Sequence, residues 1–466
     1  MSLMRSKRDV LRAAAGACGM SLLAAGCLGH ASAGSLGRPT QPRHTAPPPP
    51  LAVLQITPDR GHDVRPDQGV TITAAGGALT RVRVVAAGQL VPGVFSDGGV
   101  QWQAEWPLQP SAHYAVTAVA ENSAGKATVA SAAFSTLTPG AVMTASSNVS
   151  DGDVVGAGEP IVIQFDHPVA DEAAAERAIT LETSAPVTGA WAWFGRQELD
   201  FRPQAYWPAH TQVYLDAHFS GLAATDGAYA TGNLAVRYSI GDSQIAIANT
   251  RTHRLRYYLN GRLLWNWPMS SGADRVDPIT GESLATEDGT FLTIYKANPV
   301  IMSSASTGIT SGPDFFPPTP VYEAVNFTPS GDYVHSAPWS VGEQGSENVS
   351  HGCVNLSPDD AALFYDRAQI GDIVQVTGSP VRATPEDQTD WTYSWSRWLS
   401  RGAPRGEVVS AGPQGSAEYE PASRAMPPRM KSLSSLTVPM FLMWFPCSQP
   451  SPYEILLYYR GRCATY

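Results

Sequence analysis

Short runs of alternating apolar and polar residues recur along this chain, and glycine- and proline-rich turns separate them. The 466 residues include 42 Gly and 38 Pro, and only 15% of them are charged. Alternation with a period of two is typical of half-buried strands, and frequent Gly and Pro interrupt long helices. A chain of this length is too long to fold around a single hydrophobic core. The pattern therefore predicts a mainly β protein of several domains.

Two β-sandwiches are predicted in the first half of the chain. Residues 51–139 contain runs such as Val70–Thr73 and His113–Val119, and the pattern restarts over residues 140–240, for example at Ile161–Phe165. Such spacing is typical of immunoglobulin-like domains. Neither segment contains cysteine, so neither has the inter-sheet disulfide. We interpret four tryptophans here as core or inter-domain packing, with a carbohydrate platform as the alternative: Trp102, Trp106, Trp191 and Trp193.

Residues 241–378 are predicted to form a third, β-rich domain. Asn260-Gly261 lies between two apolar runs and favours a two-residue hairpin turn. A helix is predicted from the cap at Ser357 to Arg367, followed by a strand over 372–376.

After residue 378 the sequence pattern changes twice. Over 379–402, Trp391, Trp395 and Trp398 have the spacing of one face of a short helix, which would dock a C-terminal subdomain onto the body. Residues 403–466 are predicted to be a largely disordered, atypical tail.

The N-terminus resembles an export signal. Basic residues at Arg5–Arg8 precede an apolar run, so residues 1–27 are predicted to be a signal peptide. Leu22–Cys27 resembles a lipobox, which would make Cys27 the lipidated residue and anchor the protein to a membrane; a plain cleaved signal is the alternative. The proline-rich residues 28–50 predict an extended linker. The first 50 residues hold six Lys/Arg and one Asp, so the rest of the chain carries the negative charge, which argues against a nucleic-acid partner.

One cysteine stands apart from the others. The five cysteines lie at positions 18, 27, 353, 447 and 463, so the long body of the chain contains Cys353 alone. A lone thiol in an exported protein is either an inert buried residue or a functional one. Its neighbours, Ser350-His351-Gly352-Cys353-Val354-Asn355, favour function, because a nearby imidazole can take the thiol proton.

Two histidines are candidates for the base. His351 lies two residues before Cys353, and His335, followed by Ser336, ends a predicted strand and could approach from across the site. Gly352 allows a tight turn whose N–H groups could hold an oxyanion, and Asn355 could orient the imidazole or hold the loop.

These residues resemble the motif of the L,D-transpeptidases with a YkuD-type catalytic domain. That motif is a His, a spacer of roughly fifteen residues, and Ser/Thr-His-Gly-Cys-x-Asn, and here it runs from His335 to Asn355 with fourteen residues between His335 and Ser350. Two sandwiches, a catalytic domain and a Trp-rich C-terminal piece resemble the multidomain mycobacterial forms over about residues 51–400.

The resemblance implies an exported enzyme that forms 3→3 cross-links between peptidoglycan stem peptides, is inhibited by carbapenems, and needs neither cofactor nor metal. Cys353 would be the nucleophile and His335 the base, with its tautomer held by the Ser336 carbonyl, while His351, Gly352 and Asn355 would line the oxyanion region. The positions expected to bind substrate are Met302, Tyr322, Trp339 and Ser350. The proline-rich stretch 311–322 departs from the family's lid, and no Tyr other than Tyr322 is a candidate for the lid tyrosine.

Three other functions remain open from the sequence. Water could replace the amine as acceptor, giving an L,D-carboxypeptidase. The chain could be a non-catalytic wall-binding scaffold. His335, His351 and Cys353 could instead bind a metal, although no supporting acids are evident.

Overall fold

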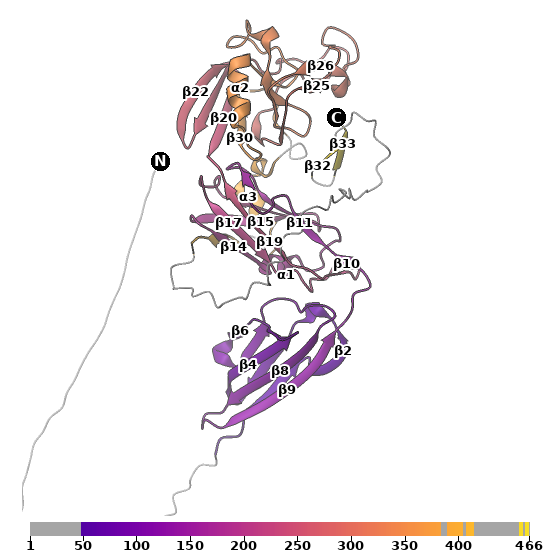
Figure 1. The fold of residues 1–466 in the computed structure, drawn as a ribbon, viewed down its shortest axis with the longest axis vertical. Coiled ribbons are helices and arrows are strands. Elements are labelled where there is room, and N and C mark those ends of the chain that lie inside the picture. Colours follow the sequence, from indigo (N-terminus) through magenta and orange to yellow (C-terminus); the bar gives the residue numbers. More distant parts are fainter. Residues whose placement is uncertain (1–47, 384–388, 404–406, 414–455, 460–461, 466) are drawn as a thin grey trace, which may run out of the picture. The chain divides into compact units, whose positions relative to one another are not determined.

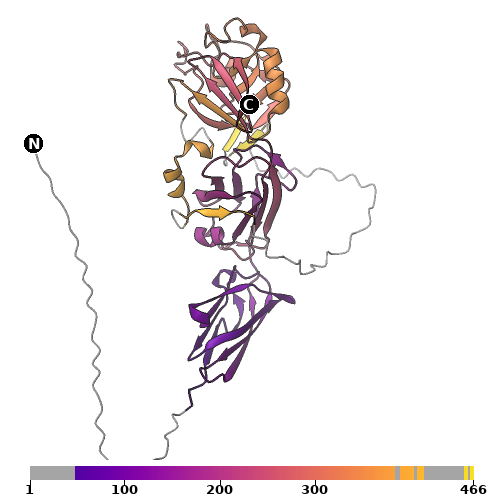
Figure 2. The same ribbon diagram turned by 90° about the vertical axis from the view of Figure 1, so that its left-hand side faces the viewer.

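The computed structural model describes residues 48–383, 389–403, 407–413, 456–459 and 462–465 (Figures 1 and 2). The predicted signal peptide, Cys27, nearly all of the linker and most of the tail lie outside the described residues. No helix among the residues described is long and apolar enough to cross a membrane.

The first sandwich consists of two antiparallel-rich sheets that enclose one apolar core. One sheet has the order β1 (Val53–Thr57), β3 (Thr71–Ala75), β7 (Gln101–Ala104), β6 (Gly93–Ser96), and the other β2 (Arg60–Val64), β9 (Ala127–Thr136), β8 (His113–Glu121), β4 (Ala78–Ala86), β5 (Gln89–Leu90). Alternate residues of β8 are buried, as the period of two requires. Trp102 lies in this core, 4% exposed.

The second sandwich repeats this arrangement with a larger core. Its sheets have the orders β11 (Ala145–Ser147), β13 (Ile161–Phe165), β16 (Glu198–Pro203), β15 (Val187–Phe194), β31 (Val409–Ala411), and β12 (Val154–Val155), β19 (Leu234–Ile240), β17 (Gln212–Ala217), β14 (Ile179–Thr183). Helix α1 (Glu172–Arg177) and the short pair β10 (Val142–Met143) and β18 (Tyr229–Ala230) complete it. Trp191 and Trp193 are buried in the core, and Trp106 stacks on His218.

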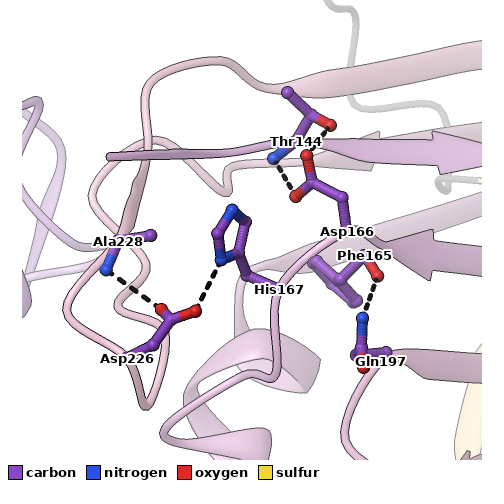
Figure 3. Close-up of polar contacts among 7 residues, drawn as sticks. All are labelled: Thr144, Phe165, Asp166, His167, Gln197, Asp226 and Ala228. Atoms are coloured by element: carbon purple, nitrogen blue, oxygen red, sulfur yellow. Dashed lines mark hydrogen bonds and ion pairs between the residues drawn. The ribbon is translucent and has the colours of Figure 1, made fainter. Parts of the chain in front are cut away.

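Side-chain hydrogen bonds hold the loops at one end of this second sandwich (Figure 3). The Asp166 carboxylate accepts from the backbone N and the hydroxyl of Thr144, both at 2.7 Å. His167 Nδ1 lies 2.7 Å from the Asp226 carboxylate, which raises the pKa of His167 and lowers that of Asp226. These contacts join three turns that are distant in the sequence.

The described part of the third domain contains two larger sheets, a two-stranded sheet of β25 (Val300–Met302) and β26 (Thr319–Val321), and helix α2 (Pro358–Arg367). The orders are β22 (Arg262–Pro268), β21 (Arg254–Leu259), β20 (Gln244–Asn249), β30 (Ile373–Thr377), β23 (Gly289–Leu292), and β24 (Tyr295–Ala297), β27 (Ala324–Asn326), β28 (Tyr333–Ser336), β29 (Val354–Leu356). The turn at Asn260-Gly261 has positive φ at both residues, 50° and 78°, which confirms the predicted hairpin. Helix α2 (Pro358–Arg367) is capped by Ser357, whose hydroxyl accepts from Asp360 N at 3.2 Å, as predicted.

The C-terminal segment returns to the second sandwich. Its three tryptophans do not share one helix as predicted: Trp391 belongs to the short turn η5 (Asp390–Thr392), whereas Trp395 and Trp398 belong to α3 (Trp395–Leu399). The chain is extended at Tyr393, with ψ of 131°, which separates the two pieces. Trp391 Nε1 donates to Gly158 O at 2.7 Å and Trp398 Nε1 to Ala190 O at 2.9 Å, so the segment does dock onto the body.

The predicted disorder of the tail is wrong for part of it. Val409–Ala411 forms β31, which pairs with Val187–Gly189 of β15. The edge of β15 offered unpaired backbone groups, and a short segment satisfies them. Backbone strands β32 (Leu456–Tyr459) and β33 (Arg462–Thr465) also pair with each other. The domain limits placed at residues 139 and 240 stay predictions.

Candidate active site

Two parallel strands bring the predicted base and nucleophile together. β28 and β29 pair so that His335 lies opposite Asn355, and Cys353 directly precedes β29. Neighbouring strands in a sheet lie about 4.8 Å apart. The two strands, which residues 337–353 separate in the sequence, therefore lie side by side in one sheet.

The His335 ring is buried and held in one tautomer. It is 3% exposed, and its Nδ1 lies 3.0 Å from the Ser336 carbonyl oxygen. A carbonyl oxygen only accepts, so Nδ1 carries the hydrogen and Nε2 keeps its lone pair. Burial lowers the pKa of His335 to about 4, and the hydrogen bond to the Ser336 carbonyl opposes this shift. At neutral pH this imidazole is an uncharged base.

The Cys353 thiol is free and half-buried. Burial raises its pKa, and the nearby Asp332 carboxyl raises it further, while the backbone N–H groups of Tyr333 and Cys353 act in the opposite direction. The resting residue is therefore a protonated thiol. Its reaction with an acyl group requires a base that takes the proton during attack.

The turn before the thiol is held by hydroxyl groups. Ser350 Oγ donates to Cys353 O at 2.5 Å and accepts from Gly352 N at 3.3 Å. Thr286 Oγ1 donates to Gly352 O at 2.5 Å. Gly352 has φ of +131°, a conformation that residues with a Cβ rarely adopt. Ser350 thus shapes the nucleophile turn from within it.

The second histidine contacts a different part of the site. His351 Nε2 donates to the carbonyl of Asp314 at 2.8 Å, and its ring lies 5.0 Å from that of Phe316. Arg275 pairs with both carboxylate oxygens of Asp314, which is 5% exposed. His351 therefore ties the nucleophile turn to the segment over 311–318.

Asn355 holds a neighbouring turn and does not hydrogen-bond His335. Its Nδ2 donates to Ser340 Oγ at 3.0 Å. Ser340 ends the short helix η4 (Pro338–Ser340), which carries Trp339. Trp339 is 59% exposed, and the centroid of its ring lies 5.9 Å from that of His335. Asn355 thereby supports an aromatic surface beside His335.

The two other expected substrate residues belong to a hairpin and its exit. Met302 ends β25 (Val300–Met302) and pairs with Thr319 of β26 (Thr319–Val321). Tyr322 follows β26, is 51% exposed, and its carbonyl accepts from Ser336 N at 3.1 Å. The exit of the hairpin therefore lies next to the strand that carries His335.

Several residues of this site were not predicted. Four of them contact the motif residues only once the chain is folded: Thr286, Asp314, Asp332 and Ser340. In the sequence they look like ordinary turn residues. Asp332 follows Ser330-Gly331, which indicates a turn and nothing more. No group of three or more His, Cys, Asp or Glu among the described residues is arranged to hold a metal ion.

A thiol, an imidazole whose Nδ1 is held by a carbonyl, and a glycine turn are the groups that nucleophilic cysteine catalysis uses. Comparison with known proteins specifies the class. Residues 243–376 match the model of the L,D-transpeptidase catalytic domain, and residues 61–223 match a bacterial Ig domain.

Named relatives extend the match over most of the chain. L,D-transpeptidase 2 of Mycobacterium tuberculosis (strain CDC 1551 / Oshkosh) is 34% identical over 358 residues, which are 76% of this chain and 85% of that protein. L,D-transpeptidase 5 of strain ATCC 25618 / H37Rv is 32% identical over 367 residues, 76% of this chain and 78% of that protein. A solved L,D-transpeptidase from Mycobacterium smegmatis is 33% identical, with a TM-score of 0.41, covering 51% of this chain and 99% of that one.

The chain belongs to the L,D-transpeptidase family. It is an acyltransferase that acts in the cross-linking of peptidoglycan.

Proposed function

We propose that Cys353 attacks the carbonyl at the L-centre of meso-diaminopimelate in a tetrapeptide stem. D-Ala leaves, a thioester forms, and the side-chain amine of a second stem takes the acyl group to give a 3→3 cross-link. The observation that carries this proposal is the His335 ring, whose Nδ1–H donates to Ser336 O at 3.0 Å and leaves Nε2 as the base.

The two half-reactions use one proton carrier. As the S–C bond forms, His335 Nε2 takes the thiol proton and then delivers it to the nitrogen of the departing D-Ala. In the second half, the imidazole takes a proton from the attacking amine and returns it to the Cys353 sulfur. A base with a pKa of about 4 begins each half-reaction uncharged at neutral pH, as general base catalysis requires.

The motif residues other than Cys353 and His335 are proposed to shape and line the site. Gly352 and Ser350 set the nucleophile turn, whose N–H groups would hold the oxyanion. Trp339, Tyr322 and Met302 would contact the donor peptide, and His351 and Asn355 would hold the segments that carry those contacts. The exposed Trp339 ring beside His335 supports this assignment.

A β-lactam carbonyl is proposed to react with the same thiol. One solved L,D-transpeptidase, 34% identical to this chain, is described in complex with imipenem. We expect a carbapenem to acylate Cys353, since opening the lactam ring needs the same nucleophile and base as the stem peptide.

Incubation of the purified protein with a disaccharide-tetrapeptide tests this function. We expect D-Ala release together with a cross-linked dimer, and a carbapenem adduct in the intact mass. Cys353→Ala should lose all three, because the sulfur that would form the thioester and the carbapenem adduct is removed. Release of D-Ala without dimer would identify an L,D-carboxypeptidase instead. Unchanged release in Cys353→Ala would leave only the scaffold role.

An extracytoplasmic location is proposed, with a lipid on Cys27 as the anchor. Support comes from the basic and apolar pattern of residues 1–27 and from the lipobox-like Leu22–Cys27. Cys27→Ser should shift the mature protein from the membrane fraction to the soluble exported fraction. An unchanged distribution would indicate a plain cleaved signal.

A further inference from the structure

A carboxyl group outside the motif lies against the nucleophile turn. Asp332 is half-buried and occupies the turn between β27 and β28. A methyl group placed on Gly352 would lie only 2.1 Å from Asp332 Oδ1. The carboxyl therefore occupies the space that a side chain at position 352 would fill.

The main chain of Asp332 is rigidly held. Its N–H donates to Thr328 Oγ1 at 2.7 Å, and its carbonyl accepts from Phe327 N at 2.9 Å and from Asn326 Nδ2 at 3.2 Å. The next residue, Tyr333, directs its backbone N–H at the Cys353 sulfur. One short segment thus contacts both Gly352 and the thiol, through a side chain and a main-chain donor respectively.

We propose that Asp332 is a positioning residue for the reaction, one that sets the orientation of the Gly352–Cys353 peptide and couples its own protonation to the reactivity of the thiol. The inference rests on the proposed role of Cys353. A carboxyl that fills the Gly352 side of the turn restricts a peptide whose φ of +131° is available to glycine. When ionised, the same carboxylate places a negative charge beside the sulfur and disfavours the thiolate.

Among the described residues, the titratable groups that interact with this carboxyl are Glu287, two residues before β23, and the Cys353 thiol. Burial and the charge of Glu287 raise the pKa of Asp332 to about 7, while the Thr328 hydroxyl opposes the shift. The neutral form of Asp332 thus dominates below pH 7, and its charge opposes thiolate formation above it.

Two substitutions separate the two parts of the role. Asp332→Asn keeps the shape that packs on Gly352 and removes the charge, whereas Asp332→Ala removes both. Asp366→Asn is the matched control, since Asp366 is an exposed carboxyl on α2. The rate of Cys353 alkylation by iodoacetamide between pH 5 and 9 reports thiolate reactivity without any peptide substrate. Cross-linking of the disaccharide-tetrapeptide reports the orientation of the turn.

We expect Asp332→Asn to speed alkylation above pH 7 by a factor of up to about ten, because one pKa unit corresponds to a tenfold change in thiolate. The inflection near pH 7 should vanish in this variant and persist in Asp366→Asn. Asp332→Ala should lower kcat for cross-linking by at least about tenfold with KM little changed, and Asp332→Asn should retain more kcat.

Two results would overturn the proposal. One is a pH profile of alkylation in Asp332→Asn that coincides with the wild type. The other is equal kcat in Asp332→Ala and the wild type. Both variants are first compared with the wild type by circular dichroism, and alkylation is normalised to folded protein. Cys353→Ala should lose all alkylation. If it does, a negative result with the Asp332 variants counts against this inference alone; if it does not, the assignment of Cys353 as the nucleophile has failed.

Discussion

At the scale of single residues, the proposed nucleophile Cys353 and the proposed base His335 are both electrically neutral at rest. Burial lowers the pKa of His335 to about 4 and raises that of Cys353, so neither group is charged at neutral pH. This differs from a preformed thiolate–imidazolium pair, in which a cationic histidine would lower the thiol pKa. The protein environment disfavours charge on both groups, and proton transfer has to accompany acyl transfer.

The neutral pair predicts how acylation depends on pH. His335 loses its base function only when it is protonated, and a pKa lowered from 6.5 to about 4 moves that loss to lower pH. The rate of carbapenem acylation of Cys353 is followed by intact mass. Protonation of His335 should therefore change this rate little between pH 7 and 5, and the rate should fall as the pH passes through 4. His335→Gln should slow acylation about 100-fold or more at pH 7. A fall centred near pH 6.5 would contradict the buried, neutral imidazole.

At the scale of elements, one buried hydroxyl joins distant parts of the segment between β25 and β26. Ser304, in the short helix η3 (Ser304–Thr307), is 1% exposed. Its Oγ accepts from Phe316 N at 2.9 Å and lies 2.8 Å from Ile309 O, to which it donates. These bonds connect both ends of a loop that borders His351 through Phe316. The loop thus keeps its shape with few regular strand bonds.

Ser304→Ala should loosen this loop. It removes the acceptor of a backbone N–H, which costs about 1–3 kcal/mol when the group stays buried. We expect faster hydrogen exchange at Phe316 and a severalfold higher KM for the stem peptide, with iodoacetamide alkylation of Cys353 unchanged. Ser306→Ala is the matched control, because Ser306 is an exposed serine of the same helix. Unaltered exchange at Phe316 would show that the hydroxyl does not hold the loop.

At the scale of the whole molecule, the C-terminal segment covers one face of a sheet in the second sandwich. The guanidinium of Arg202, on β16, lies over three indole rings, at 4.7 Å from Trp391, 5.3 Å from Trp395 and 4.9 Å from Trp398. Burial lowers the pKa of Arg202 to about 10, so it remains charged at neutral pH. Cation–π contacts and the Trp398 hydrogen bond join the chain after the catalytic domain to the sandwich before it.

Trp398→Ala tests this attachment. Trp398 is fully buried, and removing such a ring costs about 3–5 kcal/mol. We expect a lower midpoint of unfolding by urea, measured by tryptophan fluorescence, and unchanged carbapenem acylation per folded molecule. Trp395→Ala, in the same helix but only partly buried, should cost clearly less. Equal effects of the two substitutions would mean that the segment packs less specifically than the contacts indicate.

The sequence by itself determined the features that depend on neighbours along the chain. The Asn260-Gly261 turn, the Ser357 cap of α2, the alternating strands and the Ser350–Asn355 motif all follow from local backbone preferences, and the motif's chemistry follows from residue type. The tertiary structure decided which groups meet across long separations: Asp332 with Gly352, His351 with Asp314, Asn355 with Ser340, Arg202 with the three tryptophans, and β31 with β15. Such contacts arise from strand pairing and burial, which no local pattern encodes. The burial of His335, which lowers its pKa and keeps the proposed base uncharged at neutral pH, is of this second kind.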